Sequence, residues 1–229
     1  MSVDLNCDMG EMDDTVLEAA LMKLIRSANI ACGGHAGNAG SMERSVGLAL
    51  ANLVRIGAHP GYPDRANFGR VEMAMTAEEL ADTVYGQIQR LEATVTRMGG
   101  KLVHVKPHGA MYQAAARSEE VARAIGDGVA RWNPRAAVYG LAGSPALEVW
   151  RGMGLKPVAE AFADRRYEPG GALRSRSLPG ALITEPRAAA AQAVWLVREG
   201  KAQTICVHGD TPRAVEILKA CREALLYEA

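Results

Sequence analysis

The sequence predicts a single domain, residues 1–229, that folds as a seven-stranded parallel (β/α) barrel. Seven short β-like runs alternate with helical patterns along the chain, and such alternation is typical of a parallel sheet surrounded by helices. At roughly 30 residues per strand-and-helix unit, seven units fill the 229 residues and leave no linker. An open, doubly wound sheet is the alternative, because periodicity does not distinguish a closed sheet from one with edges.

The predicted strands, in order, are VDLNC (3–7), ANIAC (28–32), RIGAH (55–59), LVHVK (102–106), AVYGL (137–141), PVAEAF (157–162) and TICVH (204–208). The helix after the third strand is the clearest, because Thr76 and Glu79 form a capping-box pattern and glycines at 99–100 end its apolar repeat. Ser144 and Asp210 precede two further helices that are expected to carry proline in their first turn. Much of the apolar 48% is alanine, so we expect the helices to pack closely.

Three of the strands carry polar or ionisable side chains at every second position. Alternate residues of a barrel strand face the interior and the surrounding helices, so we expect the polar set to point into the barrel. A lysine placed there must find an anion or a partner, or lower its pKa. The set consists of Asp4, Asn6 and Asp8, then His104 and Lys106, and finally Cys206, His208 and Asp210.

Four of the five histidines, His35, His59, His108 and His208, lie just past a predicted strand. Functional groups of parallel barrels collect at that end of the strands, so this shared placement indicates one site. Histidine and aspartate there would also suit a divalent metal that activates water. Asp8, His35 and His59 are the candidate ligands, in a deacetylase-like arrangement.

Two features of this region have alternative explanations. Asp210 is placed either to cap the last helix or to act in the site. The long loop 163–183 carries arginines that are either solvated or bind an anion. They are Arg165, Arg166, Arg174 and Arg176.

Composition and motifs argue against several classes of function. Lys and Arg total 26, as do Asp and Glu, so the net charge is zero and gives no electrostatic case for a nucleic acid or a membrane as partner. No apolar run approaches the ~20 residues of a membrane span, and the start of the chain lacks the pattern of a secretory signal. We therefore expect a cytoplasmic protein. The four cysteines form no CxxC pair and are expected to be buried thiols, and no P-loop, GxSxG or HExxH motif occurs.

At the ends of the predicted strands the chain closely resembles the LamB/YcsF family, the family of the bacterial 5-oxoprolinase A subunits. The motifs that carry the resemblance run in order over residues 4–212. They stand here as DLNCDMGE (4–11), SANIACGGHAG (27–37), GAHPGYPD (57–64), FGR (68–70), VKPHGAMYQ (105–113), EAFADRRY (160–167) and ICVHGDTP (205–212).

The resemblance implies a hydrolase subunit that opens the lactam of 5-oxo-L-proline to give L-glutamate, coupled to ATP hydrolysis and working with B and C subunits. It also implies a TIM-barrel-like fold related to the glycoside hydrolase and deacetylase barrels. ATP has a chemical purpose here. An unstrained five-membered amide is a poor electrophile, and phosphorylating its oxygen would make its carbon open to attack. Since the chain has no P-loop, ATP must be held in another way or by a partner subunit.

We therefore expect the motifs to supply two sets of site residues. The catalytic set is Asp8, His35, His59, Lys106, His108 and Asp210. The substrate-binding set is Asp4, Asn6, Glu11, Asn29, Asp64, Arg70, Glu160 and His208. For His108 there are two alternatives: it transfers a proton in the cavity, or it orders its loop through a backbone hydrogen bond.

Two other functions remain open at this point. The chain could be a non-catalytic subunit that binds the substrate while B and C carry the chemistry. It could also be a stand-alone amidase or deacetylase that depends on Mg²⁺ or a similar divalent metal and needs no partners. Assembly as a homo-oligomer is equally left open by the sequence.

Overall fold

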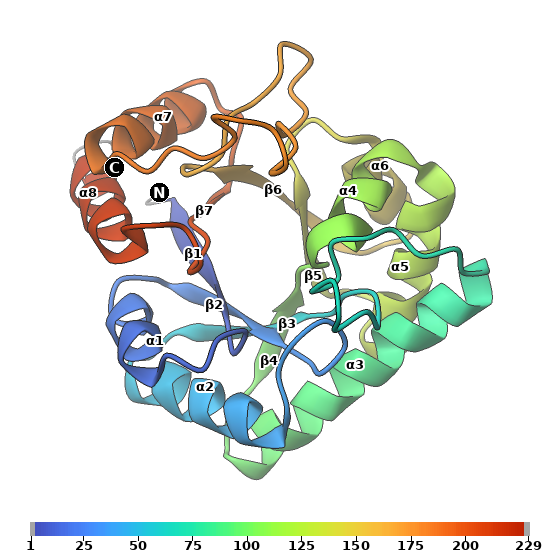
Figure 1. The fold of residues 1–229 in the computed structure, drawn as a ribbon. Coiled ribbons are helices and arrows are strands. Elements are labelled where there is room, and N and C mark those ends of the chain that lie inside the picture. The colour runs from blue at the N-terminus through green and yellow to red at the C-terminus, as the bar shows by residue number, and fades with distance from the viewer. Residues whose placement is uncertain (1–2, 227–229) are drawn as a thin grey trace.

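Seven parallel strands close into a barrel, in which each strand pairs with the next in the chain and β7 pairs with β1 (Figure 1). The computed structural model describes residues 3–226. Closure is formed by β1 against β7, with Asp4 opposite Thr204 and Asn6 opposite Cys206. The predicted closed barrel is confirmed, and the alternative of an open sheet is wrong.

The strands lie within about two residues of their predicted positions. They are β1 (Asp4–Met9), β2 (Ser27–Ala31), β3 (Arg55–His59), β4 (Leu102–Val105), β5 (Ala137–Leu141), β6 (Lys156–Phe162) and β7 (Thr204–Cys206). The main difference is at β7, which ends at Cys206 rather than at position 208. His208 therefore lies in the loop beyond the strand.

Helices surround the barrel in the part of the chain that the structure describes (Figure 1). They are α1 (Thr15–Met22), α2 (Ala39–Ala51), α3 (Ala77–Arg97), α4 (Gly109–Arg117), α5 (Glu119–Trp132), α6 (Pro145–Gly152), α7 (Pro186–Arg198) and α8 (Ala214–Leu226). The capping box of Thr76 and Glu79 is present at the start of α3. The predicted start of the last helix is wrong, because α8 begins at Ala214, so Pro212 precedes the helix and Asp210 does not cap it.

The hydrophobic core lies between the sheet and the helices. Ile30, Ile56 and Ile205 from three strands are almost fully buried there, and all four cysteines are free and buried as expected. Close helix packing is confirmed between α3 and α5, where a Cβ on Gly128 would lie only 2.6 Å from the Ala81 carbonyl oxygen. Among the described residues, no helix has the length and apolar character needed to span a membrane.

The interior of the barrel is polar, as the alternation in the strands predicts. Asn6 donates to Glu160 (2.9 Å), Asn29 donates to Asn6 (2.8 Å), and His104 bonds the side-chain oxygen of Asn29 (2.8 Å). All four side chains are 1% exposed or less. This polar column of Asn6, Asn29, His104 and Glu160 forms a rigid floor under the carboxyl ends of the strands.

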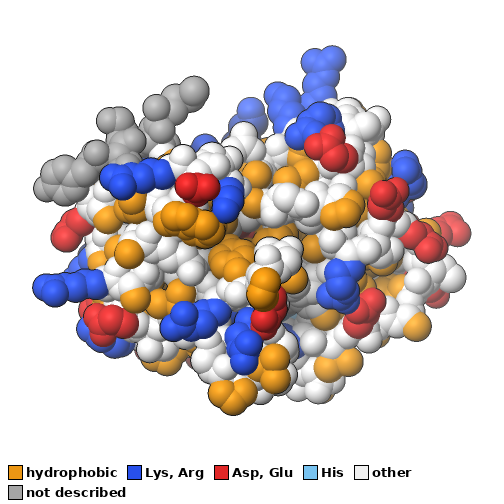
Figure 2. Space-filling model, turned by 90° about the horizontal axis from the view of Figure 1, so that it is seen from above, with side chains coloured by type: hydrophobic (Ala, Val, Ile, Leu, Met, Phe, Trp, Pro, Cys, Tyr) orange, Lys and Arg blue, Asp and Glu red, His pale blue; other side chains and the backbone are white. Residues whose placement is uncertain are grey.

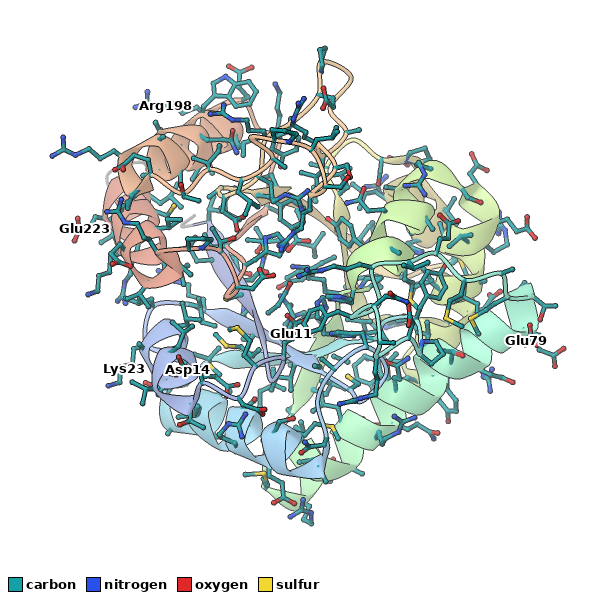
Figure 3. The ribbon with its side chains drawn as sticks, in the orientation of Figure 1. Glu11, Asp14, Lys23, Glu79, Arg198 and Glu223 are labelled. Atoms are coloured by element: carbon teal, nitrogen blue, oxygen red, sulfur yellow. The ribbon has the colours of Figure 1, made fainter. Side chains whose placement is uncertain are left out.

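The surface carries both signs of charge. On the face shown in Figure 2, Lys and Arg side chains alternate with Asp and Glu, in keeping with a formal net charge of zero. In Figure 3 the labelled Lys23, Glu79 and Glu223 lie on the outer helices, whereas Glu11 lies over the centre of the barrel. Glu11 marks the position of the site described next.

Candidate active site

A cavity of about 570 Å³ opens at the carboxyl ends of the strands. That end of a parallel barrel is where loops from every strand meet, and the lining residues come from the ends of β1, β3 and β6, from the loops after β1, β3, β4, β6 and β7, and from α4. Eight of the residues expected in the site line it. They are Asp8, Glu11, His59, Arg70, Lys106, His108, His208 and Asp210.

The other expected residues lie outside the cavity. Asn6, Asn29 and Glu160 are buried inside the barrel beneath the lining residues, and Asp4 pairs with Arg55 at the opposite end of the strands. His35 lies behind His108, with the two imidazole rings stacked 3.6 Å apart. Asp64 accepts hydrogen bonds from the backbone and side-chain amides of Asn67, so it orders the loop rather than facing the cavity.

Lys106 is buried on the cavity floor and paired with carboxylates of the protein itself. Its Nζ lies 2.9 Å from Asp8 Oδ1, 3.1 Å from Glu160 Oε1 and 3.1 Å from Cys206 Sγ. Burial alone would lower the pKa of Lys106, but the charges of Asp8 and Glu160 outweigh it and hold the pKa well above its usual value. Lys106 is therefore charged and is neutralised by the protein's own carboxylates. Of the three outcomes expected from the sequence, an anion, a partner or a lowered pKa, the structure shows a partner.

Asp8 joins the lysine to a histidine. Its Oδ1 accepts from Asn29 Nδ2 (2.9 Å) and from Lys106, and its Oδ2 lies 3.3 Å from His59 Nε2. Burial would raise the pKa of Asp8, but the positive charges of His59 and Lys106 lower it well below the usual range. Asp8 is thus a buried carboxylate shared by two cations.

Three histidines surround the carboxylate of Glu11. Oε1 of Glu11 lies 2.9 Å from His35 Nε2, 3.2 Å from His108 Nδ1 and 3.6 Å from His59 Nε2. Burial would raise the pKa of Glu11, but His108 and, more weakly, the hydrogen bond from His35 lower it well below the usual range. Burial lowers the pKa of His35 to about 4, so His35 is neutral and donates its Nε2–H to Glu11.

The outer nitrogens of His59 and His108 are both bound to carbonyl oxygens. His59 Nδ1 donates to the Lys106 carbonyl (2.7 Å), and His108 Nε2 donates to the Phe68 carbonyl (2.9 Å). Phe68 presents that carbonyl from a left-handed conformation, with φ of 56°, which is costly for a non-glycine residue. Because carbonyls only accept, both outer nitrogens carry hydrogen.

The inner nitrogens of the same two rings face each other at 3.0 Å, His59 Nε2 against His108 Nδ1. Two lone pairs would repel at this distance, so one proton lies between them. Burial would lower the pKa of His59, but Asp8 raises it above the usual value, whereas burial lowers the pKa of His108. These opposite shifts favour His59 as the ring that holds the shared proton and donates it to His108 Nδ1.

The same cluster holds the kinds of side chain that bind metal ions. Glu11, His35, His59 and His108 each offer a ligand atom within 4.8 Å of the others. A metal lies close to the plane of each imidazole that binds it, however, and the rings of His35 and His108 are parallel within 3° and 3.6 Å apart. One ion therefore cannot be bound by both, and a ligand role for His35 alongside His108 does not fit.

Three atoms of the cluster do fit. His59 Nε2, His108 Nδ1 and Glu11 Oε1 are separated by 3.0, 3.2 and 3.6 Å, close to the ~3.3 Å edge of a tetrahedron with ~2.0 Å metal–nitrogen bonds. Both histidines also donate their other nitrogen to a backbone carbonyl, as metal-binding histidines usually do. A second group, Asp8, Cys206 and His208, already holds a cation, because Lys106 Nζ contacts both Asp8 and Cys206.

Across the cavity, Asp210 from the loop after β7 pairs with Arg176 from the loop after β6 and with Arg70 from the loop after β3. Asp210 Oδ2 accepts from Arg70 Nη2 (2.5 Å) and from Arg176 Nη1 (2.7 Å). Burial would raise the pKa of Asp210, but the two arginines, Arg176 first, lower it. Asp210 therefore lines the cavity and does not cap α8, and its part in the reaction stays a prediction.

Asp164 is the residue that sequence reasoning missed. It is fully buried and accepts from the His208 backbone N–H (3.0 Å), from His208 Nδ1 (3.0 Å) and from Thr211 Oγ1 (2.5 Å). Asp164 thereby joins the loop after β6 to the loop after β7 and fixes the ring of His208. Asp164 lies inside the EAFADRRY motif, and this position was the feature of the sequence that could have identified it as a site residue.

Comparisons with known proteins agree on one family. The profile of the LamB/YcsF family matches residues 3–229. A protein of Pyrococcus furiosus that is named as the A subunit of 5-oxoprolinase is 44% identical, with 98% of this chain and 94% of that protein covered. A protein of the same name from Thermus thermophilus is 43% identical, with 98% and 96% covered.

Solved structures extend the comparison to the fold. The crystal structure of a lactam utilization protein, also from Thermus thermophilus, superposes with a TM-score of 0.91 at 42% identity, covering 100% of this chain and 97% of that one. A putative cellobiose-phosphate cleavage protein from Enterococcus faecalis has a TM-score of 0.58 at 14% identity, with 98% and 93% covered. The second likeness concerns the fold alone.

Proposed function

The chain belongs to the LamB/YcsF family, and from this premise we propose that it acts as the A subunit of an ATP-dependent 5-oxoprolinase, which hydrolyses 5-oxo-L-proline to L-glutamate. The observation that carries the proposal is that relatives 42–44% identical, matching 98% of this chain, are named as the A subunit of 5-oxoprolinase. The cavity supports it, because it brings a lysine, carboxylates and histidines to the face where barrel enzymes act.

The lactam explains why ATP and partner subunits belong to the proposal. Transfer of a phosphoryl group to the amide oxygen makes C5 electrophilic, water then attacks, and the ring nitrogen leaves after taking up a proton. Residues 3–226 contain no P-loop between a strand and a helix, so B and C subunits or the outer cavity bind the nucleotide. The products are L-glutamate, ADP and phosphate.

The histidine pair is suited to act as the general acid. It holds one proton between His59 and His108, and both residues line the cavity. Asp8 and Glu11 flank the pair and stabilise its positive charge before proton transfer. When the ring nitrogen departs, the pair gives up this proton, and a factor of about 10²–10⁴ in rate is typical of such groups.

A second candidate function is a stand-alone metal-dependent amidase or deacetylase. The observation that favours it is the three-atom set of His59, His108 and Glu11 described above. A divalent ion bound there would supply a polarised carbonyl or an activated water. The two functions exclude each other at this cluster, because the nitrogens that would bind the ion are those that share the proton.

One assay separates these candidates and also tests the non-catalytic alternative. ADP release that depends on 5-oxoproline is measured with this chain alone, with B and C alone, and with all three. We expect turnover only when all three are present and no loss on treatment with EDTA once Mg²⁺ for ATP is restored. Turnover of amides by the chain alone, abolished by EDTA, would instead support the metal-dependent enzyme. Turnover by B and C alone would show that they carry the chemistry without this chain.

A further inference from the structure

Arg165 is a buried arginine without a carboxylate partner. It follows β6, lines the cavity and is only 6% exposed. Its Nη2 donates to the Arg174 carbonyl oxygen (2.6 Å), whereas its buried Nε has no hydrogen-bond partner. Among residues 3–226, no Asp or Glu oxygen lies within 4 Å of its guanidinium.

The neighbouring charges leave Arg165 uncompensated. Asp164, next in the chain, is fully engaged by His208 and Thr211. The next carboxylate, Asp210, is already shared by Arg70 and Arg176. Three arginines on this side of the cavity therefore have one carboxylate between them, and burying an unpaired charge is costly.

The backbone holds Arg165 firmly in this position. Arg165 pairs with Leu182 in an antiparallel bridge, and the Ile183 N–H donates to the Asp164 carbonyl (2.8 Å). The Arg165 carbonyl accepts from Gln192 Nε2 of α7 (2.7 Å). Such fixation of a charged group before the ligand arrives is a property of a binding site, since it spares the ligand the cost of ordering the arginine.

We propose that Arg165, with Arg176 beside it, binds the carboxylate of the substrate. This inference rests on the proposed function and adds which part of the substrate is held where. Arginine binds carboxylates through two parallel N–H donors, and Nε of Arg165 has no hydrogen-bond partner among the described residues. Ser175 and Ser177 also line the cavity and are hydrogen-bonded to each other (2.8 Å), which leaves one of the two hydroxyls able to donate to an anion.

This placement orients the lactam. With the carboxylate held at the loops after β6 and β7, the ring extends across the cavity toward Lys106 and the His59–His108 pair. A small carboxylic acid suits the site better than a nucleotide phosphate, because Arg165 lies deep in the cavity rather than at its exposed rim. Arg165 could equally bind inorganic phosphate, so the experiment must distinguish binding of a carboxylate from binding of phosphate.

The kinetic experiment compares Arg165→Met with Arg166→Met in the complete complex. Arg166 is exposed and does not line the cavity, so it is the matched control. We expect Arg165→Met to raise KM for 5-oxoproline by about 30-fold or more, with kcat changed much less. The preference of the wild type for 5-oxoproline over 2-pyrrolidinone, which lacks the carboxylate, should disappear. An unchanged KM together with an unchanged preference would overturn the inference while the proposed function stood.

A binding experiment with this chain alone removes the dependence on turnover. Melting temperatures are measured with 5-oxoproline, L-proline, 2-pyrrolidinone and inorganic phosphate. We expect the two carboxylates to stabilise the wild type and Arg166→Met but not Arg165→Met, which should itself melt no lower than the wild type because it removes an unpaired charge. If phosphate alone stabilises through Arg165, the site is a phosphate site and the inference fails. If the complex turns over no 5-oxoproline, the proposed function fails. The changes in melting temperature with 5-oxoproline and L-proline still show whether Arg165 binds a carboxylate.

Discussion

Lys106 shows how one side chain serves both stability and chemistry. It neutralises Asp8 and Glu160 in a buried cluster, so removing it leaves Glu160 without a cation and Asp8 with His59 alone. The sequence alone suggests that Lys106→Met would abolish turnover with little effect on folding. The structure corrects this expectation, because breaking a buried ion pair by removing one partner typically costs about 3–5 kcal/mol.

We therefore predict that Lys106→Met both abolishes turnover and lowers the free energy of unfolding by about 3–5 kcal/mol. Urea denaturation of the purified chain measures the second effect. Lys101→Met, at an exposed position just before β4, is the control and should change neither quantity. A variant at 106 as stable as the control would show that Asp8 and Glu160 do not need the lysine.

His108 combines the two roles that the sequence left as alternatives, since its Nε2 bonds the Phe68 carbonyl and its Nδ1 faces the proton of His59. We predict that His108→Asn lowers kcat in the complete complex by about 10²-fold or more, because asparagine can replace a hydrogen bond but cannot pass on a proton. The melting temperature of the variant serves as the check on folding. Turnover within a few-fold of wild type would make His108 structural and move proton transfer to another group.

At the scale of elements, close packing of helices depends on glycine. Gly128 of α5 lies against α3, where an added Cβ would come within 2.6 Å of the Ala81 carbonyl oxygen and 2.9 Å of Val84 Cβ. Gly86, in the middle of α3, has nothing within 4 Å of the same added atom. The two positions therefore separate helix packing from helix propensity.

We predict opposite effects of alanine at these two glycines. Gly128→Ala should lower the free energy of unfolding by about 1–3 kcal/mol because the helices are forced apart. Gly86→Ala should raise it by about 0.5–1 kcal/mol, because alanine favours the helix. Chemical denaturation of both variants tests this, and a destabilising effect of the same size at both sites would contradict it.

Most elements could be predicted because their signals are local. Alternation in the strands placed Asp8 and Lys106 in the barrel, and the capping box located α3. The start of α8 and the role of Asp210 could not be predicted in this way. Asp210 bonds Arg70 and Arg176, which are 140 and 34 residues away, and a rule for helix caps contains no term for such distant partners.

The candidate site could also be predicted in part, because position in the chain indicates which residues reach the ends of the strands. Histidines that follow strands converge in any parallel barrel, so His59 and His108 were found from their position. Whether a residue faces the cavity, however, depends on packing behind it, as His35 stacked on His108 illustrates. Asp164 was missed because an aspartate beside two arginines is typical of a solvated loop. Its contact with His208, 44 residues away, exists only in the folded chain.

At the scale of the whole molecule, buried neutral histidines couple stability to pH. Burial lowers the pKa of His104 to about 3, helped by the charges of Arg55 and Lys106, and lowers that of His35 to about 4. In the unfolded chain both titrate near ~6.5. The unfolded state therefore binds more protons below that pH, and the stability contributed by these neutral histidines is fully present above ~6.5 and lost as the pH falls toward 4.

We predict that the free energy of unfolding falls between pH 6.5 and 4.5 and that His104→Gln makes this fall shallower. One proton contributes a slope of at most about 1.4 kcal/mol per pH unit, so the change in slope should approach that figure. Urea denaturation at several pH values measures it in wild type and variant. Equal slopes would mean that His104 binds its proton equally in both states.

The polar column inside the barrel has a consequence on the timescale of evolution. Asn6, Asn29, His104 and Glu160 satisfy one another across four different strands, so exchanging one of them leaves a neighbour buried without its partner. An aliphatic side chain of the outer shell, such as Ile30 or Ile205, can instead be replaced by another of similar volume without help from elsewhere. In an alignment of relatives, the four column positions should therefore change in compensating sets or not at all, while the shell positions drift independently.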